Sequence, residues 1–210
     1  MKLLYIDFET TGLDPKEGAA PIELAAILVQ PNRELTEISR FDSGIMAVPP
    51  NAVISQEALN VNGISRDAIA AGVNPVLACK KFCLWLEKNL DYLPGEPPRQ
   101  EKVMLAGQKV EFDVRFMEAW MSQEGIEWLF NDFFHHSKID FKAAAWTALV
   151  PTGELSKTSL GDLTAYFGIP HVAHRAMSDV EAGVEVARRL VDISARGLKD
   201  LKLDNMVHRL

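Results

Sequence analysis

Short apolar runs alternate with longer stretches of helical spacing along the chain, and this alternation predicts an α/β fold. Three strands are expected early, at residues 3–6, 22–29 and 37–46, joined as a meander. Two more are expected at residues 103–106 and 138–140, each next to a helical stretch. The first run is almost wholly apolar, which is typical of a strand buried on both faces.

Apolar residues at three- and four-residue spacing predict helices that each bury one face. Ser55 and Ser65 are suited to cap two short helices, Ser159 is suited to cap the one at 160–167, and Asn74 with Pro75 opens a longer one. The expected helices cover residues 55–61, 65–71, 75–90, 110–124, 141–149 and 160–167, with a last one starting near Ser178. The proline-rich residues 94–101 are expected to form a surface loop.

Composition places the chain among ordinary globular proteins of one domain. It has 210 residues, of which 48% are hydrophobic and 24% charged. No apolar run is long enough to span a bilayer, and charges at Asp7 and Glu9 come too early for a secretory signal. Cys79 and Cys83 lie one helical turn apart, which is typical of buried free thiols in a reducing compartment. We therefore expect a cytoplasmic location.

The net charge of −7 argues against broad, sequence-independent coating of nucleic acid. It leaves room for a narrow site in which bound metal ions supply the positive charge.

The first candidate chemistry is the pair Asp7 and Glu9, at the end of the first strand. Side chains two residues apart on a strand point to the same side. Two like charges at the end of a buried strand are costly unless a cation neutralises them, and carboxylates suit a hard divalent metal. The alternative is a strand end where both acids face water.

Asp113 is the second candidate. Apolar residues follow it at helical spacing, so Asp113 heads a buried stripe and is expected to point inward. A lone inward carboxylate is also typical of a local helix cap. If the preceding strand is a neighbour of the first, Asp113 lies near Asp7 and Glu9.

The third candidate is Asp179 with His174, five residues upstream. Ser178 and Glu181 have capping-box spacing, which predicts a helix that starts just before Asp179. An aspartate in a first helical turn also has a plain explanation in the helix dipole, and loop histidines are usually solvated. A zinc site built on His171 and His174 is discounted, because no thiol or third histidine lies nearby.

Together the three stretches resemble the three motifs of the DEDDh (DnaQ-like) family of 3′→5′ exonucleases, which includes polymerase proofreading subunits, RNase T and oligoribonuclease. The motifs are matched by residues 7–14, 107–113 and 174–179. The resemblance implies a ribonuclease H-like α/β fold, a five-stranded mixed sheet with helices on both faces. It implies a catalytic domain at residues 1–195, and a helical C-terminal tail is expected at 196–210.

The resemblance also implies the site residues. Metal ligands are expected at Asp7, Glu9, Asp113 and Asp179, with His174 as the general base. Substrate contacts are expected at Thr10, Thr11, Gly12 and Phe112. The expected cofactor is a pair of Mg²⁺ ions, replaceable by Mn²⁺, because two metals stabilise charge on both oxygens of a phosphodiester under attack. Histidine suits the base because it exists in both protonation states near neutral pH.

The expected reaction releases 5′-mononucleotides from single-stranded 3′ ends, with DNA favoured, as in DNA proofreading or repair. The alternatives are an exoribonuclease, an inactive exonuclease-like binding module, and an unrelated phosphohydrolase of nucleotides. A polymerase or a second copy of the chain is the expected protein partner, and no membrane is expected. The chain departs from the family pattern at Gln108 and Lys109, where His-Asn is frequent, and at Asn62, where histidine is frequent.

Overall fold

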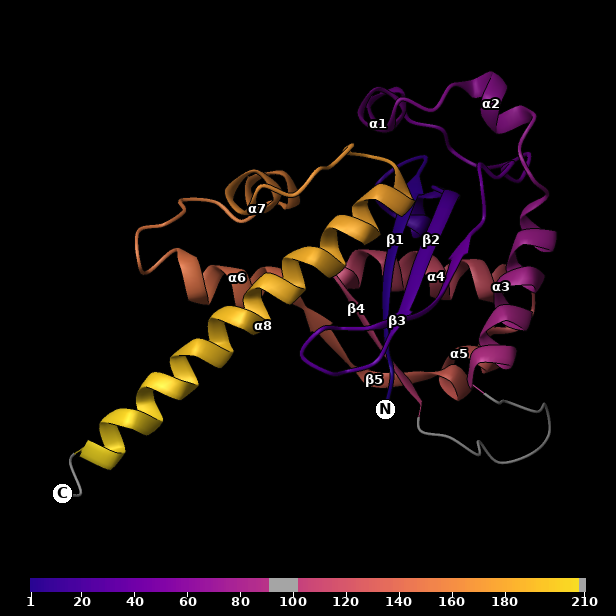
Figure 1. Cartoon of the computed structure of the whole chain (residues 1–210). Helices are drawn as coiled ribbons and strands as arrows, with labels where there is room; N and C mark the ends of the chain where they lie inside the picture. The colour runs from indigo at the N-terminus through magenta and orange to yellow at the C-terminus, as the bar shows by residue number, and fades with distance from the viewer. Residues whose placement is uncertain (91–101, 208–210) are drawn as a thin grey trace.

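The computed structural model of the chain describes residues 1–90 and 102–207, with side chains up to residue 197. The expected loop at residues 94–101 lies outside this described part. A single five-stranded sheet forms the centre, in the order β3-β2-β1-β4-β5 (Figure 1). Its strands are β1 Leu3–Thr10, β2 Pro21–Val29, β3 Glu37–Asp42, β4 Val103–Gly107 and β5 Phe134–Asp140. The β1–β2 and β2–β3 pairs are antiparallel, while β1–β4 and β4–β5 are parallel, which confirms the expected mixed sheet.

Strand ends differ from the sequence prediction in ways that matter for the site. β1 continues four residues beyond the expected end at Ile6, because β2 pairs with it as far as Thr10. Asp7 and Glu9 therefore lie within the strand, not after it. β3 ends at Asp42, and Met46 makes only an isolated bridge with Val73.

Eight α-helices are present in the described residues: α1 Gln56–Asn62, α2 Arg66–Ala70, α3 Pro75–Leu90, α4 Val110–Gln123, α5 Glu127–Phe133, α6 Phe141–Leu149, α7 Leu160–Phe167 and α8 Ala176–Val207. A single 3₁₀ turn, η1, covers Pro15–Glu17. The expected serine caps are confirmed at Ser55, Ser65 and Ser159. The sequence prediction missed α5, whose N-terminus carries no side-chain cap.

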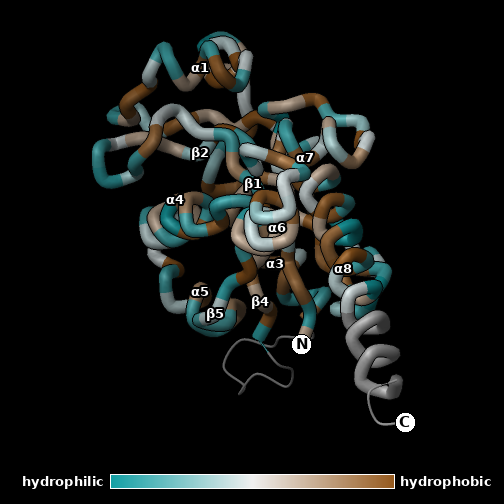
Figure 2. Tube along the Cα trace, turned by 90° about the vertical axis from the view of Figure 1, so that its left-hand side faces the viewer, coloured by the Kyte–Doolittle hydropathy of each residue, from teal (hydrophilic) through white to brown (hydrophobic). Residues whose placement is uncertain are grey.

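The helices cover both faces of the sheet, as expected. One core joins the sheet to α3, α4 and α5 through residues such as Phe82 and Trp120. The other joins it to α6, α7 and α8 through residues such as Phe141 and Leu163. In Figure 2, β1 and β4 lie between α4 and α5 on one side and α8 on the other. Cys79 and Cys83 are free and buried on α3, as expected.

The predicted start of the last helix is wrong. α8 begins at Ala176, and Ser178 is already inside it. The Ser178 hydroxyl accepts a hydrogen bond from the Val172 backbone N–H at 3.0 Å, and Glu181 pairs with Arg40 at 2.6 Å, so neither residue forms the expected capping box. Asp179 nevertheless lies in the first turn of α8.

The helix α8 runs from Ala176 to Val207 without a break and so passes through residue 195. The division into a domain at 1–195 and a tail at 196–210 stays a prediction. Among the described residues, no helix has the length and apolar character needed to cross a membrane.

The segment between β3 and α3 is fastened to the sheet by backbone bonds. Met46 donates to the Ile22 carbonyl at 2.8 Å, and Val73 donates to the Ile45 carbonyl at 2.8 Å. Gly72 lies directly against this junction. A Cβ atom added at Gly72 would be 2.6 Å from the backbone nitrogen of Ala47. Only glycine lets the two backbone stretches approach this closely.

We expect Gly72→Ala to lower the free energy of unfolding by about 1–3 kcal/mol, because the backbone must shift to admit the methyl group. Gly161→Ala is the matched control: its Cβ would meet nothing closer than 3.9 Å, so the change should stay within about 1 kcal/mol. Urea unfolding of the two variants measures the difference. Equal stability of both would contradict the close approach at Gly72.

Candidate active site

The sheet topology brings the three candidate segments to one place. Because β1 and β4 are parallel neighbours, α4, which follows β4, starts at the edge where β1 ends. Asp113 on α4 is 3% exposed, and its Oδ1 accepts a hydrogen bond from the Phe8 backbone N–H at 2.9 Å. The predicted inward direction of Asp113 is confirmed, and its carboxylate lies between Asp7 and Glu9 along the strand.

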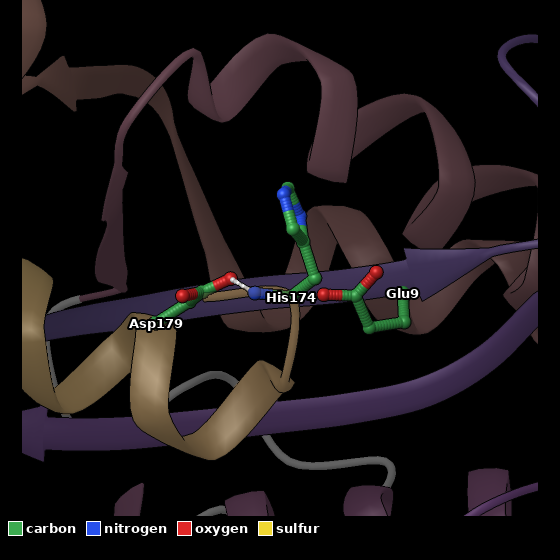
Figure 3. A group of neighbouring side chains, drawn as sticks. All are labelled: Glu9, His174 and Asp179. Atoms are coloured by element: carbon green, nitrogen blue, oxygen red, sulfur yellow. Dashed lines mark hydrogen bonds between the residues drawn. The ribbon is translucent and has the colours of Figure 1, made fainter. Parts of the chain in front are cut away.

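The first turn of α8 lies against the same edge. One ligand atom each of Glu9, His174 and Asp179 lies within 4.8 Å of the other two, a grouping that can hold a metal ion. Glu9 is buried, Asp179 is partly buried and His174 is exposed. Figure 3 shows the carboxylates of Glu9 and Asp179 on either side of His174.

Burial and mutual repulsion raise the pKa values of the acids on β1. Burial is the largest cause for Asp7, whose pKa lies well above its ordinary value, followed by the charges of Asp113 and Asp179. The pKa of Glu9 is raised to about 8, chiefly by burial and then by Asp179 and Glu23. These acids are held close enough together to resist ionising at the same time.

Asp113 behaves in the same way. Burial raises its pKa to about 8, and the hydrogen bond from Phe8 partly opposes the rise. A cluster of buried carboxylates with raised pKa values is the environment that a divalent cation stabilises, and oxygen ligands suit Mg²⁺ or Mn²⁺. The donor set at Asp7, Glu9, Asp113 and Asp179 therefore fits a hard metal.

Two groups on the loop that enters α8 form hydrogen bonds with the carboxylate of Asp179. The His174 backbone N–H donates to Oδ2 at 3.1 Å, and the His171 imidazole hydrogen-bonds to Oδ1 through Nε2. Nδ1 of His171 lies 3.4 Å from the Thr164 hydroxyl on α7. His171 is the residue that the sequence analysis missed, since its spacing suggested only a discounted zinc pair. Its contact with Asp179 depends on the path of the loop, which no local pattern reveals.

The expected substrate-contact residues border this site. The hydroxyls of Thr10 and Thr11 form hydrogen bonds within the chain. Thr10 donates to the Gly12 carbonyl at 2.7 Å, and Thr11 donates to the Val53 carbonyl at 2.6 Å. Thr11 is fully buried, so its side chain fastens the turn after β1. Phe112 is partly buried and packs on Phe116 with ring centroids 4.9 Å apart. Their role toward substrate stays a prediction.

The residues that depart from the family pattern also hold loops in place. Gln108 donates to the Thr158 carbonyl at 2.9 Å, and Lys109 adopts a left-handed φ of 55° at the start of α4. Asn62 donates to the Thr10 carbonyl at 3.2 Å and accepts from the Ile64 backbone at 3.0 Å. Asn62 thereby ties α1 to the end of β1.

The raised pKa values predict how the stability of the metal-free protein depends on pH. The pKa of Glu9 rises from 4.5 to about 8 and that of Asp113 from 3.8 to about 8 on folding. A raised pKa means that the folded state holds protons which the unfolded state releases, so stability falls as pH rises from about 4 to about 8. We expect this loss in urea unfolding with a chelator present, and a smaller loss with excess Mg²⁺.

Glu9→Gln removes one of these titrating groups and should flatten the pH dependence without metal. Glu118→Gln, at an exposed acid on α4, is the control and should leave the dependence as it is. A pH dependence that is identical in Glu9→Gln and the unsubstituted protein would show that Glu9 does not belong to the group of mutually repelling acids.

Comparisons with known proteins support an exonuclease family. The family model RNase_T, described as an exonuclease, matches residues 4–92. The chain is 24% identical over 192 residues to DNA polymerase III PolC-type of Thermotoga maritima, and equally to that of Thermotoga petrophila. These matches cover 90% of the chain but only 12% of each relative, so the chain corresponds to a small part of those proteins.

Solved structures share the fold. Exonuclease I of E. coli in complex with a dT13 oligonucleotide matches with a TM-score of 0.73 and 22% identity, over 95% of this chain and 43% of that one. Exonuclease I of Methylocaldum szegediense matches with a TM-score of 0.67 and 24% identity, over 90% and 40%. The family model and the PolC-type relatives support the expected resemblance to the DnaQ-like exonuclease family, and Exonuclease I shares the fold.

Proposed function

We propose that the chain is a metal-dependent 3′→5′ exonuclease that releases 5′-mononucleotides from single-stranded 3′ ends. The observation that carries the proposal is the convergence of Glu9, His174 and Asp179, with one ligand atom of each within 4.8 Å of the others, beside the acids Asp7 and Asp113. This arrangement supports a site built from all five expected groups at one edge of the sheet. An inactive binding module has no need to keep this costly cluster of carboxylates.

Asp7, Glu9, Asp113 and Asp179 would hold two Mg²⁺ ions, with Mn²⁺ as a substitute. When bound, such ions supply positive charge to the phosphate that is cleaved. Without metal ions the acids repel one another, and bound Mg²⁺ would relieve this repulsion.

His174 is the group best suited to take a proton from the attacking water. Its ring is exposed, which lets it pass the proton on to solvent after each reaction. The hydrogen bond from its backbone N–H to Asp179 fixes its loop beside the acids. His171 is buried against Asp179 and is less accessible to a water molecule that attacks the substrate.

Single-stranded DNA is the substrate that we favour, and RNA is the alternative. The acidic chain offers little attraction for a long phosphate backbone, so affinity should rest on the metals and on stacking of the last bases. Leu13 and Val172, which are 81% and 68% exposed, flank the segments that carry the acids and the histidine. The PolC-type relatives favour DNA, and a polymerase or a second copy of the chain is the proposed partner in the cytoplasm.

We expect His174→Ala to slow cleavage by about 10²–10⁴-fold with metal affinity nearly unchanged, because only the proton acceptor is lost. Asp7→Asn, Glu9→Gln and Asp179→Asn should each lose most activity together with metal affinity. Single-turnover cleavage of labelled single-stranded DNA and titration with Mn²⁺ measure the two effects. Glu118→Gln is the control and should cleave like the unsubstituted protein. Near-normal turnover by any two of the acid variants would contradict the proposed metal site.

Direction and substrate are tested with end-labelled oligonucleotides in Mg²⁺. A 5′-labelled DNA strand should shorten stepwise, and a 3′-phosphate should block it, because the reaction needs a free 3′ hydroxyl. Blunt duplex ends should react more slowly, since unstacking the terminal pair costs roughly a few kcal/mol. A steep salt dependence, or processive digestion of duplex, would contradict weak backbone binding. Matched RNA strands decide between the two nucleic acids.

A further inference from the structure

Glu23 is a buried carboxylate that the proposed reaction does not use. It lies on β2 directly opposite Glu9 in the antiparallel register and is 4% exposed. A buried charge is costly unless it is paired and hydrogen-bonded. Its partners therefore show what the charge does in the structure.

Both oxygens of Glu23 are occupied by the segment that follows His174. The guanidinium of Arg175 donates from Nη2 to Oε1 at 2.9 Å and from Nε to Oε2 at 3.4 Å. The backbone N–H of Ala176, the first residue of α8, donates to Oε2 at 3.2 Å. Glu23 thus binds the two residues that follow His174, through both of its oxygens.

The backbone of His174 is left-handed, a conformation that persists only when surrounding contacts stabilise it. Its φ is 62°, in the left-handed region that residues with a side chain rarely adopt. On one side, Asp179 accepts the hydrogen bond from the His174 N–H. On the other side, Glu23 holds Arg175 and Ala176. The residue is therefore fixed between α8 and β2.

We propose that Glu23 and Arg175 are positioning residues: they hold His174 in its left-handed conformation and so keep its imidazole beside Glu9 and Asp179. This inference rests on the proposed function, because the base is useful only in a reaction. Glu23 acts through Arg175 and the start of α8, without touching substrate or metal. The side chain of Arg175 is 52% exposed. Its positive charge partly opposes the rise in the pKa of Glu9.

The geometry separates three kinds of substitution. Glu23→Gln keeps an acceptor for the Ala176 N–H but removes the charge that binds Arg175. Arg175→Gln removes the same ion pair from the exposed side and leaves the buried carboxylate of Glu23 bound by the Ala176 N–H alone. Arg175→Lys keeps the charge but cannot form the two-pronged contact of a guanidinium.

The experiment compares single-turnover cleavage of single-stranded DNA at saturating Mn²⁺ with direct Mn²⁺ titration and thermal unfolding. Glu23→Gln and Arg175→Gln should each slow cleavage by about 10²-fold, as expected when a catalytic group is misplaced by about 1 Å. The double variant should be no slower than either single one, because both remove the same contact. Arg175→Lys should recover part of the rate. Mn²⁺ affinity should change by less than about threefold, a limit that marks no loss of a ligand.

Asp192→Asn is the matched control. It removes the 2.8 Å ion pair with Arg33, which ties α8 to the loop between β2 and β3. This pair lies about four helical turns beyond the start of α8. Its cleavage rate should equal that of the unsubstituted protein. This control separates positioning of His174 from a general loss of α8 attachment.

The inference is overturned if folded Arg175→Gln or Glu23→Gln cleaves within about threefold of the unsubstituted protein, a change too small for a misplaced base. It is also overturned if the rate loss follows a matching loss of Mn²⁺ affinity, which would make Glu23 part of the metal site. If Glu23→Gln does not fold, Arg175→Gln decides the question. An unsubstituted protein that cleaves no substrate refutes the proposed function instead.

Discussion

The constraint on which this structure depends is the crowding of carboxylates at one edge of a buried sheet. Glu9 and Asp113 are buried, Asp7 is partly buried, and the three acids repel one another, so that the pKa of each is raised. Such a cluster costs stability unless a cation joins it, so the rest of the fold must hold it together. Two apolar cores, one on each face of the sheet, provide this support.

The order of the strands in the sheet brings these acids together. β1 carries two of the acids, and its pairing with β4 on one side and β2 on the other brings α4 and Glu23 to them. Asp113 is then fixed by the backbone of Phe8 rather than by a side chain. This hydrogen bond ties the Asp113 carboxylate to the backbone of β1. It limits how far the carboxylates can move apart when they repel one another.

The loop that enters α8 is held by contacts that also keep His174 beside the acids. Asp179 receives a backbone hydrogen bond from His174 and an imidazole from His171, while Glu23 holds the residues that follow. A short segment with a left-handed residue is stable here because charged groups on two different elements bind it. The same contacts keep an exposed histidine close to buried acids.

The sequence by itself determined the local features. The apolar runs, the serine caps at Ser55, Ser65 and Ser159, and the inward direction of Asp113 follow from side-chain periods and capping chemistry, which act over a few residues. The resemblance of three motifs to those of an exonuclease family also predicted the acids and His174 as one set.

Only the tertiary structure decided the extension of β1 through Glu9, the start of α8 at Ala176, and the partners of Asp179 and Glu23. These depend on strand pairing and on contacts such as that between Glu23 and Arg175, 152 residues apart in the chain. No local period records such contacts, because they form only when distant segments have already packed against the same edge of the sheet.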